Sequence, residues 1–117
     1  MEKRQHERLV KKIKVTYTVL SKVDSTPFEF GEAVTVDISS GGLSLLVQVA
    51  VPVPSLVQLH LRMPLRPYGM FVLGKVVYCA PVEEIGMHRV GVKFVGLLPA
   101  DLESALNEVQ NIEDQPN

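Results

Sequence analysis

LVKKIKVTYTV, residues 9–19, alternates apolar and polar side chains over most of its length. From Ile13 onward the odd positions are apolar, while the even positions from 12 to 18 carry lysine or threonine. Successive side chains of a β-strand point to opposite faces, so a period of two predicts a strand with one face in a core.

Turn signals divide the rest of the chain into further short β-rich runs. Gly41 and Gly42 precede one run, and prolines at 52, 54, 64 and 67 bracket another. The further strands are expected at 33–39, 43–49, 56–63, 70–79 and 87–95. No helix is expected between any two strands, which favours an antiparallel barrel or sandwich over a parallel sheet. Because closure removes exposed edges, we expect an all-β fold built on a six-stranded antiparallel β-barrel.

A C-terminal helix is expected after Pro99, which suits a first helical turn. Apolar residues then recur at helical spacing, at Leu102, Leu106, Val109 and Ile112. This apolar stripe could cover an open end of the barrel or the surface of a partner. The last residues, 113–117, are expected to form a frayed tail.

The composition fits one globular domain. The chain has 117 residues, which is enough for a single core. Hydrophobic residues make up 46% and charged residues 21%, which excludes a disordered class of protein. Cys79 is the single cysteine and no secretory signal is present, so a reducing, cytoplasmic location is expected. Cys79 lies in an apolar run and is expected to be a small buried hydrophobe.

The charge is distributed unevenly along the chain. The net charge is −1, but six of the twelve basic residues lie in the first fourteen positions. The segment from Asp101 to Asn117 carries five acidic residues and no basic one. One local basic patch on a near-neutral protein suits a compact anionic ligand better than a long nucleic acid, which rewards many dispersed phosphate contacts.

Signals for metal binding, catalysis and membrane insertion are missing from the sequence. His6, His60 and His88 lack the spacing of metal ligands. Glu83 and Glu84 are adjacent, which is poor geometry for paired acid and base chemistry in an extended segment. We therefore expect no enzyme activity, no metal site, no cofactor and no membrane insertion.

Two short motifs carry the functional prediction. Arg4 and Arg8 form an RxxxR pattern, and residues 37–42, DISSGG, form a DxSxxG pattern. Taken alone, the first could be a solvated basic tail and the second a hairpin with an Asx turn. Their occurrence together, in this order, is much rarer by chance and favours a common site.

The chemistry of both motifs suits a guanine nucleotide. A guanidinium can engage the O6 and N7 acceptors of guanine bidentately, which lysine cannot reproduce. Strand alternation is expected to turn Val36 and Ile38 inward, and to project Asp37 and Ser39 outward, where the carboxylate can accept from the guanine edge. The glycines that follow can adopt φ > 0 and let a ligand approach the backbone.

These motifs, followed by the strand RVGVKF at residues 89–94, resemble those of PilZ domains, and the resemblance covers nearly the whole chain. It implies a six-stranded split barrel with a C-terminal helix that binds the second messenger cyclic di-GMP. It further implies a ligand-binding role for these five residues: Arg4 and Arg8 at guanine and phosphate groups, Asp37 and Ser39 at a guanine edge and nearby polar atoms, and Gly42 in keeping the turn open. Lys3 and Gly41 are secondary candidates.

The organisation expected from this resemblance has three parts. Residues 1–8 form a flexible ligand-binding arm, 9–112 form the barrel with its helix, and 113–117 form the tail. Cyclic di-GMP would bridge the arm to the barrel and so create a surface that an unidentified protein effector reads. The chain is expected to be a bacterial receptor, either monomeric or homodimeric.

Two other function classes stay open from the sequence. One is a PilZ-fold adaptor that binds a protein partner without nucleotide through its acidic C-terminal helix. The other is a small OB-like barrel for single-stranded nucleic acid. The latter is disfavoured because three tyrosines, four phenylalanines and no tryptophan offer little stacking surface.

Overall fold

The computed structural model describes residues 12–20, 29–63, 65–96 and 98–114. These residues form six strands and one helix, in the predicted order. The strands are β1 (Lys14–Val19), β2 (Glu29–Ile38), β3 (Gly42–Val47), β4 (Ser55–Leu61), β5 (Met70–Val82) and β6 (Met87–Val95), and the helix is α1 (Leu102–Asp114). The first residues of the first predicted strand, 9–11, lie outside the described part.

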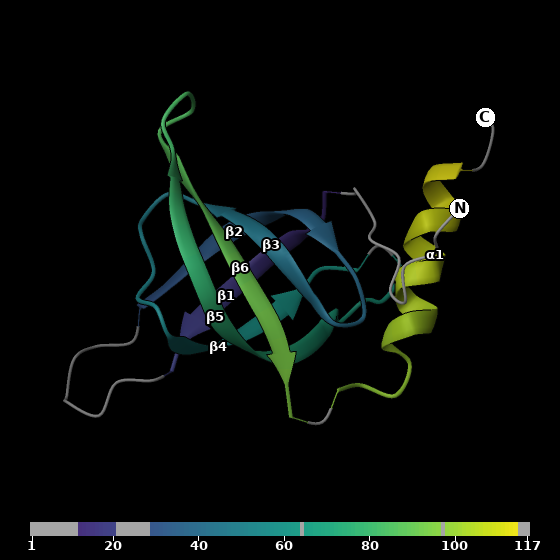
Figure 1. Ribbon diagram of the computed structural model, residues 1–117. Coiled ribbons are helices and arrows are strands. Elements are labelled where there is room, and N and C mark those ends of the chain that lie inside the picture. Colours follow the sequence, from purple (N-terminus) through teal and green to yellow (C-terminus); the bar gives the residue numbers. More distant parts are fainter. Residues whose placement is uncertain (1–11, 21–28, 64, 97, 115–117) are drawn as a thin grey trace, which may run out of the picture.

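The strands close into an antiparallel barrel in the order β1-β2-β3-β6-β5-β4 (Figure 1). Closure occurs because β1 pairs with both β2 and β4, so each strand of the barrel has a neighbour on both sides. This arrangement removes the exposed edges that a sandwich would leave. The predicted fold class, a six-stranded antiparallel barrel with a C-terminal helix, is confirmed.

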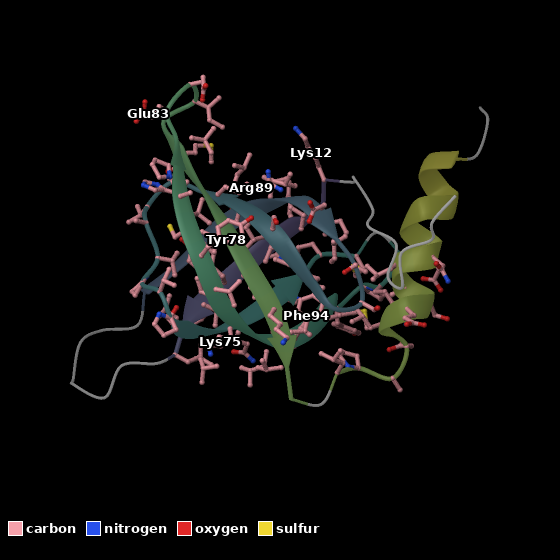
Figure 2. The ribbon with its side chains drawn as sticks, viewed as in Figure 1. Lys12, Lys75, Tyr78, Glu83, Arg89 and Phe94 are labelled. Atoms are coloured by element: carbon pink, nitrogen blue, oxygen red, sulfur yellow. The ribbon has the colours of Figure 1, made fainter. Side chains whose placement is uncertain are left out.

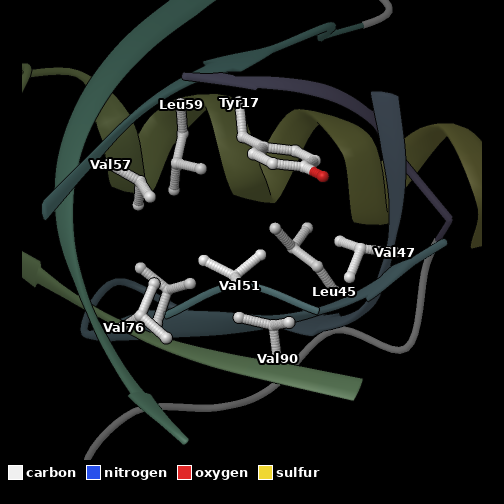
Figure 3. A pocket seen from close by; sticks show the side chains of 9 residues that line it. Tyr17, Leu45, Val47, Val51, Val57, Leu59, Val76 and Val90 are labelled. Atoms are coloured by element: carbon white, nitrogen blue, oxygen red, sulfur yellow. The ribbon is translucent and has the colours of Figure 1, made fainter. Parts of the chain in front are cut away.

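The inward-facing side chains fill the barrel with an apolar core. In β1, Val15, Tyr17 and Val19 are buried while Lys14 is exposed, as the alternation predicts. Figure 3 shows the centre of the barrel, where a small internal pocket has an apolar lining. The residues that line it are Tyr17, Leu45, Val47, Val51, Val57, Leu59, Val76, Val90 and Val92. Cys79 packs against this core as expected, but it is half-buried and not fully buried.

A β-bulge in β2 changes which residues face the core. The register with β3 shifts between Thr35 and Asp37, so that Val36 is the extra residue. As a result Thr35 and Ile38 are both buried, and Val36 is only half-buried. The prediction that Val36 faces the core is therefore wrong, because simple alternation does not continue through a bulge. A second bulge, in β5, shifts the register with β6 between Val76 and Tyr78.

The helix α1 lies beside one end of the barrel (Figure 1). Leu102, Ala105 and Leu106 are buried and belong to the same apolar cluster as the barrel interior. Arg66, in the β4–β5 connection, forms ion pairs with Asp101 and, at 3.2 Å, with Glu108. The start of α1 therefore covers the barrel, which is the first of the two roles expected for the apolar stripe. Within the described ranges, no helix is long and apolar enough to cross a membrane.

Candidate ligand-binding site

Four neighbouring strands bring one row of residues together on the outer surface of the barrel. Asp37 of β2 pairs with Ser44 of β3, Ser44 pairs with Gly91 of β6, and Gly91 pairs with Tyr78 of β5. The adjacent row along the same strands contains Ile38 and points into the core. Because side chains alternate between faces, the row that contains Asp37 points outward. We call these four residues the outer row.

Tyr78 lies across the outer face of β6. A Cβ atom at Gly91 would lie 2.1 Å from Cε2 of Tyr78, so the ring rests directly on this glycine. The Tyr78 hydroxyl reaches the Ser44 hydroxyl at 3.4 Å. The ring therefore spans from β5 to β3, and the residue keeps 41% of its surface exposed. This provides a partly exposed aromatic surface beside Asp37.

Arg89 reaches Asp37 across β3. Its Nη2 donates to Oδ2 of Asp37 at 3.4 Å, and the two side chains are 43% and 16% exposed, respectively. Arg89 lies on β6, two positions before Gly91, and therefore on the same outer face. Figure 2 shows Arg89 and Tyr78 on the outer face formed by β5, β6 and β3. The carboxylate of Asp37, the guanidinium of Arg89 and the ring of Tyr78 thus converge above the hydroxyl of Ser44.

Ser39 differs from its expected orientation. It is only 4% exposed. Its hydroxyl accepts from the backbone N–H of Gly41 at 3.2 Å, and its own N–H donates to the carbonyl of Gly42 at 2.9 Å. Ser39 therefore closes the β2–β3 turn instead of projecting beside Asp37. The expectation of an outward acid–hydroxyl pair is corrected, because the β2 bulge and the turn end the regular alternation at this point.

Gly42 has a packing role that the sequence did not indicate. A Cβ atom there would lie 2.3 Å from the carbonyl oxygen of Val92, so β3 and β6 can approach only if residue 42 is glycine. The described glycines with φ > 0 are Gly69, Gly86 and Gly96. The expectation that Gly41 and Gly42 use φ > 0 is therefore wrong in this conformation.

The three predicted basic site residues, Lys3, Arg4 and Arg8, lie outside the described residues. The chain just before β1 is nevertheless anchored close to the outer row. The N–H of Ile13 donates to Oγ1 of Thr35 at 2.9 Å, and the N–H of Thr35 donates to the carbonyl of Ile13 at 3.0 Å. Thr35 lies two positions before Asp37 on β2. Residue 13 is thus beside the strand that carries Asp37.

Sequence reasoning missed the roles of Ser44, Tyr78, Arg89 and Gly91. The strand that contains Arg89 and Gly91 was identified, but only as part of the barrel. The available signal was an arginine at an outward position of a strand, two positions before a glycine. That signal does not say which residues of β2 and β5 lie opposite, since the bulges decide the register.

Other sites offer less to a polar ligand. The internal pocket is lined almost wholly by aliphatic side chains, with Tyr17 as the residue that carries a hydroxyl, so it does not suit a charged molecule. In the described part of the chain, no group of three or more His, Cys, Asp or Glu residues could hold a metal ion. The outer row is therefore the best-supported place for an anionic, aromatic ligand.

Comparison with known proteins agrees with the barrel fold. Residues 2–109 match the model of the PilZ domain family. The chain belongs to this family. None of the curated proteins compared matches the sequence of this PilZ domain.

Two solved structures share the fold at low sequence identity. The inhibitor of motility MotI/DgrA from Bacillus subtilis has a TM-score of 0.72 and 13% identity, over 99% of this chain and 55% of that one. The PilZ domain of YcgR from Escherichia coli, solved with c-di-GMP, has a TM-score of 0.51 and 12% identity, over 95% of this chain and 88% of that one. This PilZ domain thus spans about half the length of MotI, and identities this low establish the shared fold alone.

Proposed function

We propose that this PilZ domain is a cyclic di-GMP receptor that binds the messenger on the outer row. The observation that carries the proposal is the convergence of Asp37, Arg89 and Tyr78 over β3, at the end of the strand that leads into the DxSxxG turn. The family match and the YcgR structure with c-di-GMP support the choice of ligand.

The groups of the outer row complement the groups of the messenger. Guanine has N1 and N2 donors, which a carboxylate such as Asp37 accepts, and a flat face, which an aromatic ring such as Tyr78 can stack on. Each phosphate carries a negative charge, which the guanidinium groups of Arg4 and Arg8 on the arm can neutralise bidentately. The site therefore has a separate partner for the base edge, the base face and the phosphate.

The arm can reach the outer row from its anchor. Ile13 is hydrogen-bonded to Thr35, beside Asp37. An extended chain covers at most about 3.5 Å per residue, so Arg8 can lie up to about 17 Å from Ile13 and Arg4 up to about 31 Å. Both distances exceed the separation between Thr35 and Asp37, which is about 7 Å along a strand. This supports a ligand held between Arg4 and Arg8 on one side and Asp37 on the other, with Ser39 and Gly42 shaping the turn beneath it.

The proposed output is a change in surface and not a reaction. Binding would order residues 1–8 against the barrel, and a protein effector would recognise the surface so formed. A ligand can shift this equilibrium only as far as it prefers the ordered state, so contacts to both arm and barrel are required. No catalytic step is assigned to the chain.

Titration calorimetry of the full chain tests the ligand assignment. We expect cyclic di-GMP to bind with micromolar or tighter affinity. Cyclic di-AMP should bind far more weakly, because adenine lacks the O6 acceptor and the N2 donors. No heat with cyclic di-GMP would instead support a nucleotide-independent adaptor. Preferential binding of a single-stranded oligonucleotide would instead support the remaining function class, a small barrel that binds single-stranded nucleic acid.

Tyr78 is expected to contribute to affinity by stacking. Tyr78→Ala should weaken cyclic di-GMP binding about 10-fold, as expected for loss of one base–aromatic contact. Gly91→Ala should weaken binding in the same direction, because the new Cβ would displace the ring that lies 2.1 Å from its position. Tyr68→Ala is the matched control, since Tyr68 is 85% exposed in the β4–β5 connection. If the Tyr78 and Tyr68 variants bound cyclic di-GMP with equal affinity, Tyr78 would not be part of the binding site.

A further inference from the structure

Arg89 is only partly satisfied by its contact with Asp37. The contact joins one terminal nitrogen to one oxygen at 3.4 Å, whereas charge-assisted hydrogen bonds are usually about 2.7–2.9 Å long. Among the described residues, Nε of Arg89 is buried and has no hydrogen-bond partner. A buried donor without a partner is unfavourable, so the guanidinium gains from any acceptor that arrives in this place.

The position of Arg89 is also suited to a ligand. Its side chain crosses β3 and ends at Asp37, while the ring of Tyr78 crosses β6 and ends at Ser44. The guanidinium and the ring therefore border the same area of the outer surface. The side chain of Arg89 is 43% exposed, so it can be reached from solvent without unfolding a strand.

We propose that Arg89 is a further ligand-binding arginine, which changes partner when the nucleotide binds. In the free protein it pairs with Asp37. When Asp37 accepts hydrogen bonds from a guanine edge, Arg89 turns to a phosphate oxygen of the same ligand. This rests on the proposed function, because it names a second cationic contact, on the barrel wall, for the same nucleotide.

The exchange has a physical reason in the balance of charges. The contact between Arg89 and Asp37 is a single bond of 3.4 Å and the Arg89 side chain is 43% exposed, so opening it costs little. A phosphate offers the guanidinium two parallel hydrogen bonds in place of one long bond. Asp37 meanwhile accepts from the two donors of guanine N1 and N2. The guanidinium of Arg89 therefore gains hydrogen bonds in the bound state, and Asp37 keeps donors in place of Arg89.

Replacement of Arg89 tests the proposal. Arg89→Gln should weaken cyclic di-GMP binding about 10-fold in calorimetry, the effect of one charged hydrogen-bonding partner. Arg89→Lys should recover part of this loss, because it keeps the charge but not the planar fork. Arg62→Gln is the matched control, since Arg62 is exposed and bonds Thr16 at 3.0 Å and not Asp37. Arg62→Gln should bind like the wild type.

A second measurement follows the change of partner directly. The Nε–H resonance of Arg89, assigned by its loss in Arg89→Gln, should shift when cyclic di-GMP is added. Thermal unfolding without ligand should be nearly the same for the variant and the wild type, which separates binding from folding. Tighter or unchanged binding by Arg89→Gln would overturn the proposal, because Arg89 would then only compete with the ligand for Asp37. If the wild type itself binds no cyclic di-GMP, the proposed function fails instead.

Discussion

Replacing Arg8 with alanine is expected to weaken cyclic di-GMP binding by at least about 100-fold. Arg8 is the member of the RxxxR pair closer to the anchor of the arm at Ile13, where the backbone is bonded to Thr35. Fewer residues separate Arg8 than Arg4 from this anchor, so Arg8 loses less conformational entropy when it reaches the outer row. Its loss removes a bidentate partner for guanine or phosphate and also weakens the tie between the arm and the barrel.

Two further variants make the Arg8 prediction specific. Arg8→Lys should bind almost as poorly as Arg8→Ala, because an ammonium does not form the planar fork. Lys12→Ala, which removes an exposed positive charge near the same anchor, should change affinity only slightly. If Arg8→Ala and Lys12→Ala were equally mild, the arm would act through general charge, and the specific contact of Arg8 with the ligand would be abandoned.

Replacing Gly42 with valine is expected to lower the free energy of unfolding by about 3 kcal/mol. The new Cβ would lie 2.3 Å from the carbonyl oxygen of Val92, which belongs to the backbone of β6 and cannot rotate away. β3 and β6 would have to separate where Gly42 pairs with Lys93. Because these strands carry Ser44 and Gly91, the outer row would widen as well.

Urea denaturation measures this effect in the absence of ligand. Lys93→Val is the matched control, because residue 93 faces Gly42 in the register and its side chain is exposed. Valine is favourable in strands, so this variant should be close to the wild type in stability. A Gly42→Val protein as stable as the control would show that the motif glycine serves the ligand alone and not the contact between the strands.

The fold was largely predictable from local patterns. Alternation in residues 13–19 predicts the first strand, and β1 (Lys14–Val19) has that alternation. The helical spacing from Leu102 predicts α1 (Leu102–Asp114). These signals work because a strand or helix exposes one face to water and the other to the core over its whole length. Apolar and polar residues therefore recur along the sequence with the period of that element.

The candidate site was predictable only in part. The motif positions Asp37 and Gly42 were identified, but the orientation of Ser39 and the reason for Gly42 were not. A bulge at Val36 changes the phase of alternation, and nothing in the local composition marks it. The partner of Asp37 comes from Arg89, far along the chain, and is set by the pairing of β3 with β6.

The sequence alone determined that this chain folds as a barrel with one helix, that it belongs with PilZ domains, and that its conspicuous motifs are RxxxR and DxSxxG. Only the tertiary structure decided that Asp37, Ser44, Gly91 and Tyr78 share one outward row, and that Arg89 reaches it across β3. The reason is that periodicity is a property of neighbouring residues, whereas register is settled by how separate strands pack around a common core.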